Sequence, residues 1–357
     1  MAIVYNREPF DGTPNRWDWL FAAQMLSAQE SGDWGKVVVA SQAMSSGVLY
    51  LQKSLFGGAY SSVIFVSSRG LNVVSILGTQ SPLQLVGELA ASTLVPFDGL
   101  PGRVSAYFAV DLLFVLQGIL ATVNPAYPTV FVGHSLGGAT AELLASYLSN
   151  TLGKSVQAVY TLGAPCPGDA AFASTLGMPV LRLEAAGDIV PSVPQPLGVF
   201  LSAVLHVPSN PDWSFYTQAG SAFTLAADGS IAAGHTQLTP AQILGIVLAG
   251  EVSTHYVQSY IQRLALNSQA PGNLVPGANG YEKPWTLVGL VEQPLAVPAN
   301  TSADYVPQYI RPLLYTGMNE VSRSGKTTVL SLLPDYPPQS WVPQLTAAGQ
   351  QPGCCTP

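Results

Sequence analysis

The chain has 357 residues, of which 48% are hydrophobic, so it can bury one large core or two ordinary ones. Only 9% of the residues are charged, against roughly 25% in typical soluble domains, and the formal net charge is −7. This balance excludes a basic stripe able to neutralise nucleic-acid phosphates, and it argues against electrostatic docking on an anionic membrane.

Targeting and cysteine signals are sparse. The longest apolar stretch, residues 104–123, is interrupted by Asp111 and Gln117, so we expect no integral membrane segment. The N-terminal residues MAIVYNREPFDG show no secretory signal, although an extracellular location remains our favoured expectation. Cys166, Cys354 and Cys355 do not form a disulfide framework, and the last two are expected to be free thiols.

The first two thirds of the chain alternate between strand and helix patterns. Residues 1–35 form a polar lead-in dotted with aromatic side chains. β-Branched or apolar runs predict strands at 61–69, 72–80, 129–135, 158–165 and 179–188. Helical spacing of apolar residues predicts helices at 105–120 and 136–150. Strands alternating with helices predict an α/β fold with a mostly parallel sheet.

Later elements are a hairpin, two helices and an irregular tail. Residues 223–235 predict a hairpin that turns at Asp228 and Gly229. Residues 239–250 predict a helix with Thr239 as N-cap and Pro240 at the first helical position, and a second helix is expected at 253–266. Beyond about residue 268 proline and glycine become frequent. We expect residues 1–267 to form one domain and residues 268–357 a partly irregular extension packed on it.

The segment from Gly133 to Gly137 reads Gly-His-Ser-Leu-Gly and fits G-x-S-x-G, the nucleophile elbow of α/β-hydrolases. In that turn the serine adopts a costly backbone conformation, and its neighbours two positions away must be small. The following helix directs its first amides at the serine, where anionic charge develops. The apolar strand before Ser135 and the amphipathic helix after it favour this interpretation over an ordinary tight turn.

A serine nucleophile needs a base, and the chain has four histidines. His134 is adjacent to Ser135 on a sharp turn, so its side chain points elsewhere and we assign it a packing role. In α/β-hydrolases the acid and then the histidine follow the serine in the sequence. That order leaves His206, His235 and His255 as candidates.

The acid should lie just after a strand that follows the elbow. Asp188 does so, because it ends the predicted strand at 179–188. Asp169 is better explained as a helix cap and Asp228 as a hairpin residue, whereas Asp212 in a loop stays an alternative.

Four segments, in order, resemble the class 3 lipase family, the fungal-type triacylglycerol lipases with their bacterial and plant relatives. VVSILGTQS resembles its oxyanion segment, TVFVGHSLGGATAELLA its elbow, VYTLGAPCPGD the turn after the elbow, and LRLEAAGDIVPSVP its acid segment. The resemblance covers about residues 60–265. It departs from the family at Leu77, where arginine is usual, at GRVSAYF in place of His-x-Gly-Phe, and at Cys166.

The resemblance implies an α/β-hydrolase fold, with a mostly parallel central sheet flanked by helices, that acts on lipid esters. It places Thr79 in the oxyanion position, makes Asp188 the acid, and favours His255, in THYVQSYI, as the base, with His235 as runner-up. The amides of Thr79 and Leu136 would hold the oxyanion. Ester hydrolysis through an acyl-enzyme on Ser135 is therefore expected, with no cofactor and no metal.

Several alternatives stay open. A cutinase-like polyesterase, a phospholipase A1 and an acyltransferase share the same catalytic groups, and a non-catalytic binding scaffold is the alternative from a different class. The substrate is expected to be a lipid or ester, met at an oil–water interface. The apolar series within residues 81–102 is either a mobile lid helix or an ordinary connecting helix.

Overall fold

A computed structural model describes residues 10–30, 46–53, 59–66, 71–78, 93–123, 125–194, 211–236, 238–249 and 252–266. Its α-helices are α1 (Arg16–Glu30), α3 (Ala106–Thr122), α4 (Leu136–Ser146), α5 (Ala170–Ala173), α7 (Pro240–Ala249) and α8 (Val257–Leu266). Shorter helical segments are η2 (Tyr147–Thr151), η3 (Val190–Ser192), η4 (Pro211–Phe215) and η5 (Ser253–His255). Among these described helices, none has the length and apolarity to cross a bilayer.

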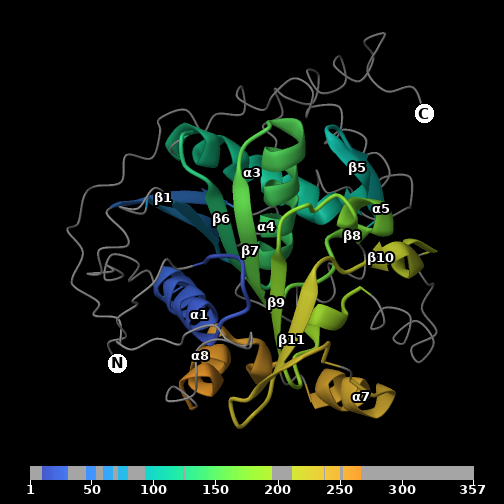
Figure 1. Cartoon of the computed structure of the whole chain (residues 1–357). Coiled ribbons are helices and arrows are strands. Elements are labelled where there is room, and N and C mark those ends of the chain that lie inside the picture. The colour runs from blue at the N-terminus through green and yellow to red at the C-terminus, as the bar shows by residue number, and fades with distance from the viewer. Residues whose placement is uncertain are drawn as a thin grey trace.

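The strands form two sheets (Figure 1). The large one has the order β1 (Ser46–Lys53), β2 (Ala59–Val66), β3 (Asn72–Ile76), β6 (Thr129–His134), β7 (Val156–Leu162), β9 (Val180–Ala185), β11 (Ser221–Leu225), β12 (Ile231–Ala233). Strands β3, β6, β7, β9 and β11 pair in parallel, whereas β1, β2 and β12 are antiparallel to their neighbours. The small sheet has the order β10 (Tyr216–Thr217), β8 (Gly168–Asp169), β5 (Leu100–Ser105), β4 (Leu94–Phe97).

Helices cover both faces of the large sheet because its central strands are apolar on both sides. On β6, Val130 and Val132 point into the core shared with α1 and α8, and Phe131 points into the core shared with α3 and α4. Figure 1 shows α1 and α8 lying together on one side of the sheet. A mostly parallel sheet flanked by helices, with a serine turn between β6 and α4, is the predicted α/β-hydrolase fold.

The first 35 residues are not only a polar lead-in, because Arg16–Glu30 form helix α1. Trp19 and Phe21 are buried against the sheet, and the helix also buries polar side chains. The Asp18 carboxylate accepts hydrogen bonds from the Phe10 amide and the Tyr160 hydroxyl, and Arg16 donates to carbonyls at the end of α8 and in the β11–β12 turn. Because α1 is covered on most sides, its sequence lacks the amphipathic pattern by which a helix is predicted.

Two other predicted helices differ from the structure in their described parts. Within the candidate lid, residues 94–97 and 100–105 form the β4–β5 hairpin, while residues 81–92 lie outside the described residues. The helix predicted at 253–266 is a 3₁₀ turn followed by α8, because Tyr256 between them has extended backbone angles. The extension from residue 268 onward also lies outside the described residues.

Two local predictions are confirmed in detail. Helix α7 begins at Pro240, and the Thr239 hydroxyl accepts from the Gln242 amide while the Gln242 side chain accepts from the Thr239 amide. The β11–β12 hairpin turns at Asp228, whose carboxylate accepts from the amide and hydroxyl of Ser230.

Candidate active site

Ser135 occupies a strained turn between β6 and α4. Its φ is +56° and its ψ is −134°, a conformation that costs a non-glycine residue about 1–3 kcal/mol. The turn is held by two backbone bonds: the Ser135 amide donates to the Leu162 carbonyl at 2.9 Å, and the Gly138 amide donates to the Ser135 carbonyl at 2.9 Å. The serine predicted as nucleophile is therefore fixed in place by the surrounding strands.

The glycines around Ser135 are required sterically, as the motif predicts. A Cβ at Gly133 would collide with the Gly137 carbonyl, and one at Gly137 would collide with the Ile76 carbonyl at the end of β3. A Cβ at Gly78 would lie 2.8 Å from the Ser135 Cβ and 3.0 Å from the Leu136 amide nitrogen. The chain leaving β3 thus runs directly beside the serine and the first amide of α4.

The course of the chain after β3 can be compared with the predicted oxyanion site. Leu136 is the first residue of α4, where amides have no partner within the helix, and it is fully buried. Thr79 follows Gly78 directly but lies outside the described residues. The positions of Gly78 and Leu136 agree with an oxyanion site here, and the role of Thr79 stays a prediction.

Asp188 follows β9 and is enclosed by three hydrogen-bond donors. Its carboxylate accepts from the Val190 amide at 3.0 Å, from the Tyr260 hydroxyl at 2.6 Å and from His255 Nδ1 at 2.9 Å. Burial alone would raise the pKa of this carboxyl, but the charge of His255 and these hydrogen bonds outweigh it and lower the pKa below its ordinary value. Asp188 is therefore held in its ionised form.

His255 lies in the 3₁₀ turn before α8 and is buried, with its Nδ1 bound to Asp188. A carboxylate only accepts hydrogen bonds, so Nδ1 carries a hydrogen, and whenever the ring is neutral Nε2 is free to accept. Within the described residues, neither His255 Nε2 nor Ser135 Oγ has a hydrogen-bond partner. The structure pairs the predicted acid with the predicted base, and the turn that carries the predicted nucleophile contacts the same histidine through His134.

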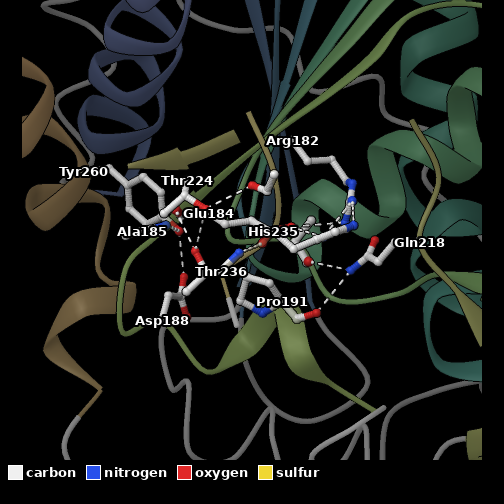
Figure 2. Close-up of polar contacts among 12 residues, drawn as sticks. Arg182, Glu184, Ala185, Asp188, Pro191, Gln218, Thr224, His235, Thr236 and Tyr260 are labelled. Atoms are coloured by element: carbon white, nitrogen blue, oxygen red, sulfur yellow. Dashed lines mark hydrogen bonds and ion pairs between the residues drawn. The ribbon is translucent and has the colours of Figure 1, made fainter. Parts of the chain in front are cut away.

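The runner-up histidine lies elsewhere. His235 is 56% exposed, next to the end of β12, and contacts Arg182 at 3.3 Å and Glu184 at 3.4 Å (Figure 2). His206 lies outside the described residues. Neither described contact of His235 places it beside Ser135.

The competing acids have structural roles. Asp169 caps α5 as predicted, since its carboxylate accepts from the Phe172 amide at 3.0 Å. Asp212, in η4, accepts from the Leu94 amide and from Arg103, which ties η4 to the small sheet. Asp228 belongs to the β11–β12 turn. Of the four aspartates considered, the structure places Asp188 against a histidine.

Sequence reasoning gave Tyr260 and Gly163 no role in this site and gave His134 only a packing role. Tyr260 donates to Asp188 and accepts from the Ala185 amide at 3.0 Å, so it joins α8 to the end of β9. His134 contacts the backbone of His255, as described below. Gly163, with a φ of +61°, leaves room for Asp188 and His255, because a Cβ there would lie 2.6 Å from the Asp188 carboxylate and 3.0 Å from His255 Nδ1. The resemblance to the family already included an aromatic residue a few positions after the base, and in THYVQSYI that residue is Tyr260.

A second cluster of buried polar side chains lies on the face of β9 that is turned toward α4, and Figure 2 shows two of its members, Arg182 and Glu184. Arg182 Nη1 lies 3.2 Å from Glu184 Oε1, and both side chains are almost fully buried. Glu142 of α4 is fully buried nearby, and its carboxyl oxygens have no hydrogen-bond partner within the described residues. Burial, opposed by the charge of Arg182, raises the pKa of Glu142 to about 8.

Comparisons with known proteins find lipases. The family described as Lipase (class 3) matches residues 73–197. A curated lipase of Rhizomucor miehei is 42% identical over 85 residues, which are 22% of this chain and 23% of that protein. The match therefore spans about a quarter of the curated relative's length.

Solved lipase structures give a looser likeness. A lipase of Rhizopus microsporus var. chinensis aligns with a TM-score of 0.46 and 18% identity, covering 78% of this chain and 96% of that one. A triacylglycerol lipase of Penicillium expansum aligns with a TM-score of 0.44 and 15% identity, covering 62% and 86%. By sequence, residues 73–197 of this chain, which contain both Ser135 and Asp188, are similar to the class 3 lipase family.

Proposed function

We propose that this protein hydrolyses carboxylic esters of lipids through an acyl-enzyme formed on Ser135. The observation that carries the proposal is the buried Asp188–His255 pair beside a strained serine turn. The Rhizomucor miehei relative, a lipase by name, supports lipid esters as the substrate class.

The chemistry follows from the hydrogen positions. His255 Nε2 accepts the proton of the Ser135 hydroxyl as Oγ attacks the ester carbonyl carbon, and the ring becomes an imidazolium. Asp188, already ionised and hydrogen-bonded to Nδ1, stabilises that cation and holds the ring in the required tautomer. His255 then returns the proton to the leaving alcohol, and water repeats the sequence on the acyl-enzyme.

Negative charge on the carbonyl oxygen is stabilised at the start of α4. The Leu136 amide, together with that of Thr79, donates to this oxygen, and the N-terminal end of the helix adds its dipole. Losing one such donor typically costs about 10²–10³ in turnover. The Leu136 amide is held by β6 and the first turn of α4, so it needs no reorganisation to act in this way.

The test combines covalent labelling with a substrate panel. A fluorophosphonate probe should label the wild-type chain and fail to label Ser135→Ala, and p-nitrophenyl esters from short to long acyl chains should be hydrolysed only by the wild type. Triacylglycerol emulsions, phospholipid vesicles, polyester film and an added acceptor alcohol distinguish lipase, phospholipase A1, cutinase-like and acyltransferase activity. A wild-type chain that is neither labelled nor active would support the non-catalytic scaffold instead.

A further inference from the structure

His134, the residue before Ser135, reaches across to the turn that carries His255. Its Nε2 lies 2.7 Å from the His255 carbonyl oxygen, and the two imidazole rings stack with centroids 4.6 Å apart at an angle of 30°. His134 is nearly buried and His255 fully so. The strand that delivers the nucleophile is thus bonded directly to the backbone of the candidate base.

The other contacts of the His255 turn act on different groups. Asp188 holds the ring through Nδ1, and the Thr254 hydroxyl donates to the Gly187 carbonyl at 2.9 Å, which ties the turn to the loop after β9. Both contacts come from the acid's side of the site. The bond from His134 comes from the serine's side, so it bears on the separation between Ser135 and His255.

The hydrogen-bond geometry determines the state of His134. A backbone carbonyl only accepts, so Nε2 of His134 carries the hydrogen and donates. Burial and the neighbouring charge of His255 lower the pKa of His134 to about 3, although its bond to the His255 carbonyl opposes this. His134 therefore stays neutral at working pH, and it adds no like charge when the stacked His255 ring becomes an imidazolium.

We propose that His134 is a positioning residue, which sets the distance between Ser135 Oγ and His255 Nε2 through its bond to the His255 carbonyl and its ring stack. The proposal rests on the function proposed above and adds a role that the G-x-S-x-G motif does not require. A misplacement of about 1 Å between reacting groups can cost on the order of 10² in rate. The expected signature is a change in kcat and little change in KM.

Two substitutions separate the bond from the ring. His134→Phe keeps a stacking ring without a donor, and we expect kcat for a soluble p-nitrophenyl ester to fall about 10–100-fold with KM within about twofold. His134→Gln supplies an amide donor at a similar reach and should recover most of that loss. Tyr160→Phe is the matched control, because Tyr160 is a buried ring on the neighbouring strand whose hydroxyl bonds to Asp18. It should lower the melting temperature without lowering kcat.

Wild-type kcat in His134→Phe would overturn the proposal. So would a kcat loss that His134→Gln leaves uncorrected, or that Tyr160→Phe reproduces at an equal loss of melting temperature. A readout independent of turnover separates this proposal from the proposed function. The proton shared by His255 Nδ1 and Asp188 should give a low-field ¹H NMR signal that shifts or broadens in His134→Phe and returns in His134→Gln. An unchanged signal would refute positioning even in a chain that hydrolyses no ester, whereas inactivity with the expected signal change would refute only the esterase function.

Discussion

Two clusters of buried polar side chains lie along strand β9, and they differ in how many hydrogen bonds their carboxyl groups receive. Beyond its end, Asp188 accepts from an amide, a hydroxyl and an imidazole, and its pKa is lowered. Within the strand, Arg182 and Glu184 face α4, where Glu142 has no hydrogen-bond partner within the described residues and a pKa of about 8. The first environment stabilises a charge and the second suppresses one, although both are equally buried.

The comparison shows that burial alone does not decide ionisation. Donors directed at a carboxylate keep it charged in the interior, whereas a carboxyl near a guanidinium but without hydrogen bonds becomes neutral instead. A charge needed for stabilising an imidazolium belongs in the first setting. We therefore expect substitutions at Asp188 to change rate and substitutions at Glu142 to change stability.

The largest effect is expected from Asp188→Asn. The amide can no longer stabilise the imidazolium of His255 and favours the wrong tautomer, so kcat should fall about 10³–10⁴-fold. Steady-state kinetics on a soluble ester measure this. A loss of less than tenfold in a folded variant would refute the role of Asp188, and Asp212→Asn serves as a control that should keep kcat.

Tyr260→Phe tests whether the donors around Asp188 matter individually. The variant removes the 2.6 Å hydrogen bond to Asp188 and leaves the Ala185 amide without its acceptor. We expect kcat to fall about tenfold and the free energy of unfolding to fall about 1–3 kcal/mol. Chemical denaturation and kinetics on the same preparation give both values; unchanged kcat would show that Asp188 does not depend on this bond.

Glu142→Gln tests how the buried carboxyl of Glu142 makes stability depend on pH. The pKa of Glu142 is raised in the folded chain from 4.5 to about 8, so the folded state binds a proton that the unfolded state has lost. Stability should therefore fall as pH rises from about 5 to about 8, by about 1.4 kcal/mol for each unit of pKa difference. The variant should flatten this slope and melt at a higher temperature at pH 8 than the wild type. Parallel slopes in the two proteins would contradict the suppressed charge.

Asp188 should show the opposite sign. Because its pKa is lowered on folding, its contribution to stability is present above the unfolded pKa and is lost as pH falls through the lower folded value. Melting curves of the wild type and Asp188→Asn at acidic pH should therefore converge as pH decreases. Curves that separate further at low pH would reverse this assignment.

The smallest effect is expected from His235→Ala. This exposed residue contacts Arg182 and Glu184 and not the serine turn, so kcat should stay within about twofold of the wild type. If His235→Ala lost activity while His255→Ala kept it, the base would be His235 and not His255.

The sequence predicted those parts of the site that carry local signals. The neighbouring glycines identified Ser135, and the position just after a strand identified Asp188. The assignment of His255 needed the family resemblance, because chain order left three histidines open. The hydrogen bonds of His134 and Tyr260 were not predicted because their partners are distant in sequence, and a contact across the fold leaves no periodic pattern.

The fold followed the same rule. The alternating strands and helices around Ser135 were predicted because each element has one clear period. Helix α1 was missed since its surface is covered by the sheet and by α8, and its polar residues are satisfied inside the protein. The β4–β5 hairpin was missed because the apolar residues at 83–94 allowed a helix to be predicted within 81–102. Residues 94–97 and 100–105 instead pair with each other as strands.

The helix pair on one face of the sheet has a practical consequence for any recombinant fragment. A piece cut at the family boundaries, 73 and 197, would keep Ser135 and Asp188 but lose His255 and Tyr260. It would also lose α1 and α8, which leaves Val130, Val132 and their neighbours facing water. Such a fragment should be insoluble as well as inactive, since a large exposed apolar surface promotes aggregation. We therefore expect the smallest fragment that keeps this face of the sheet covered to extend from α1 to α8.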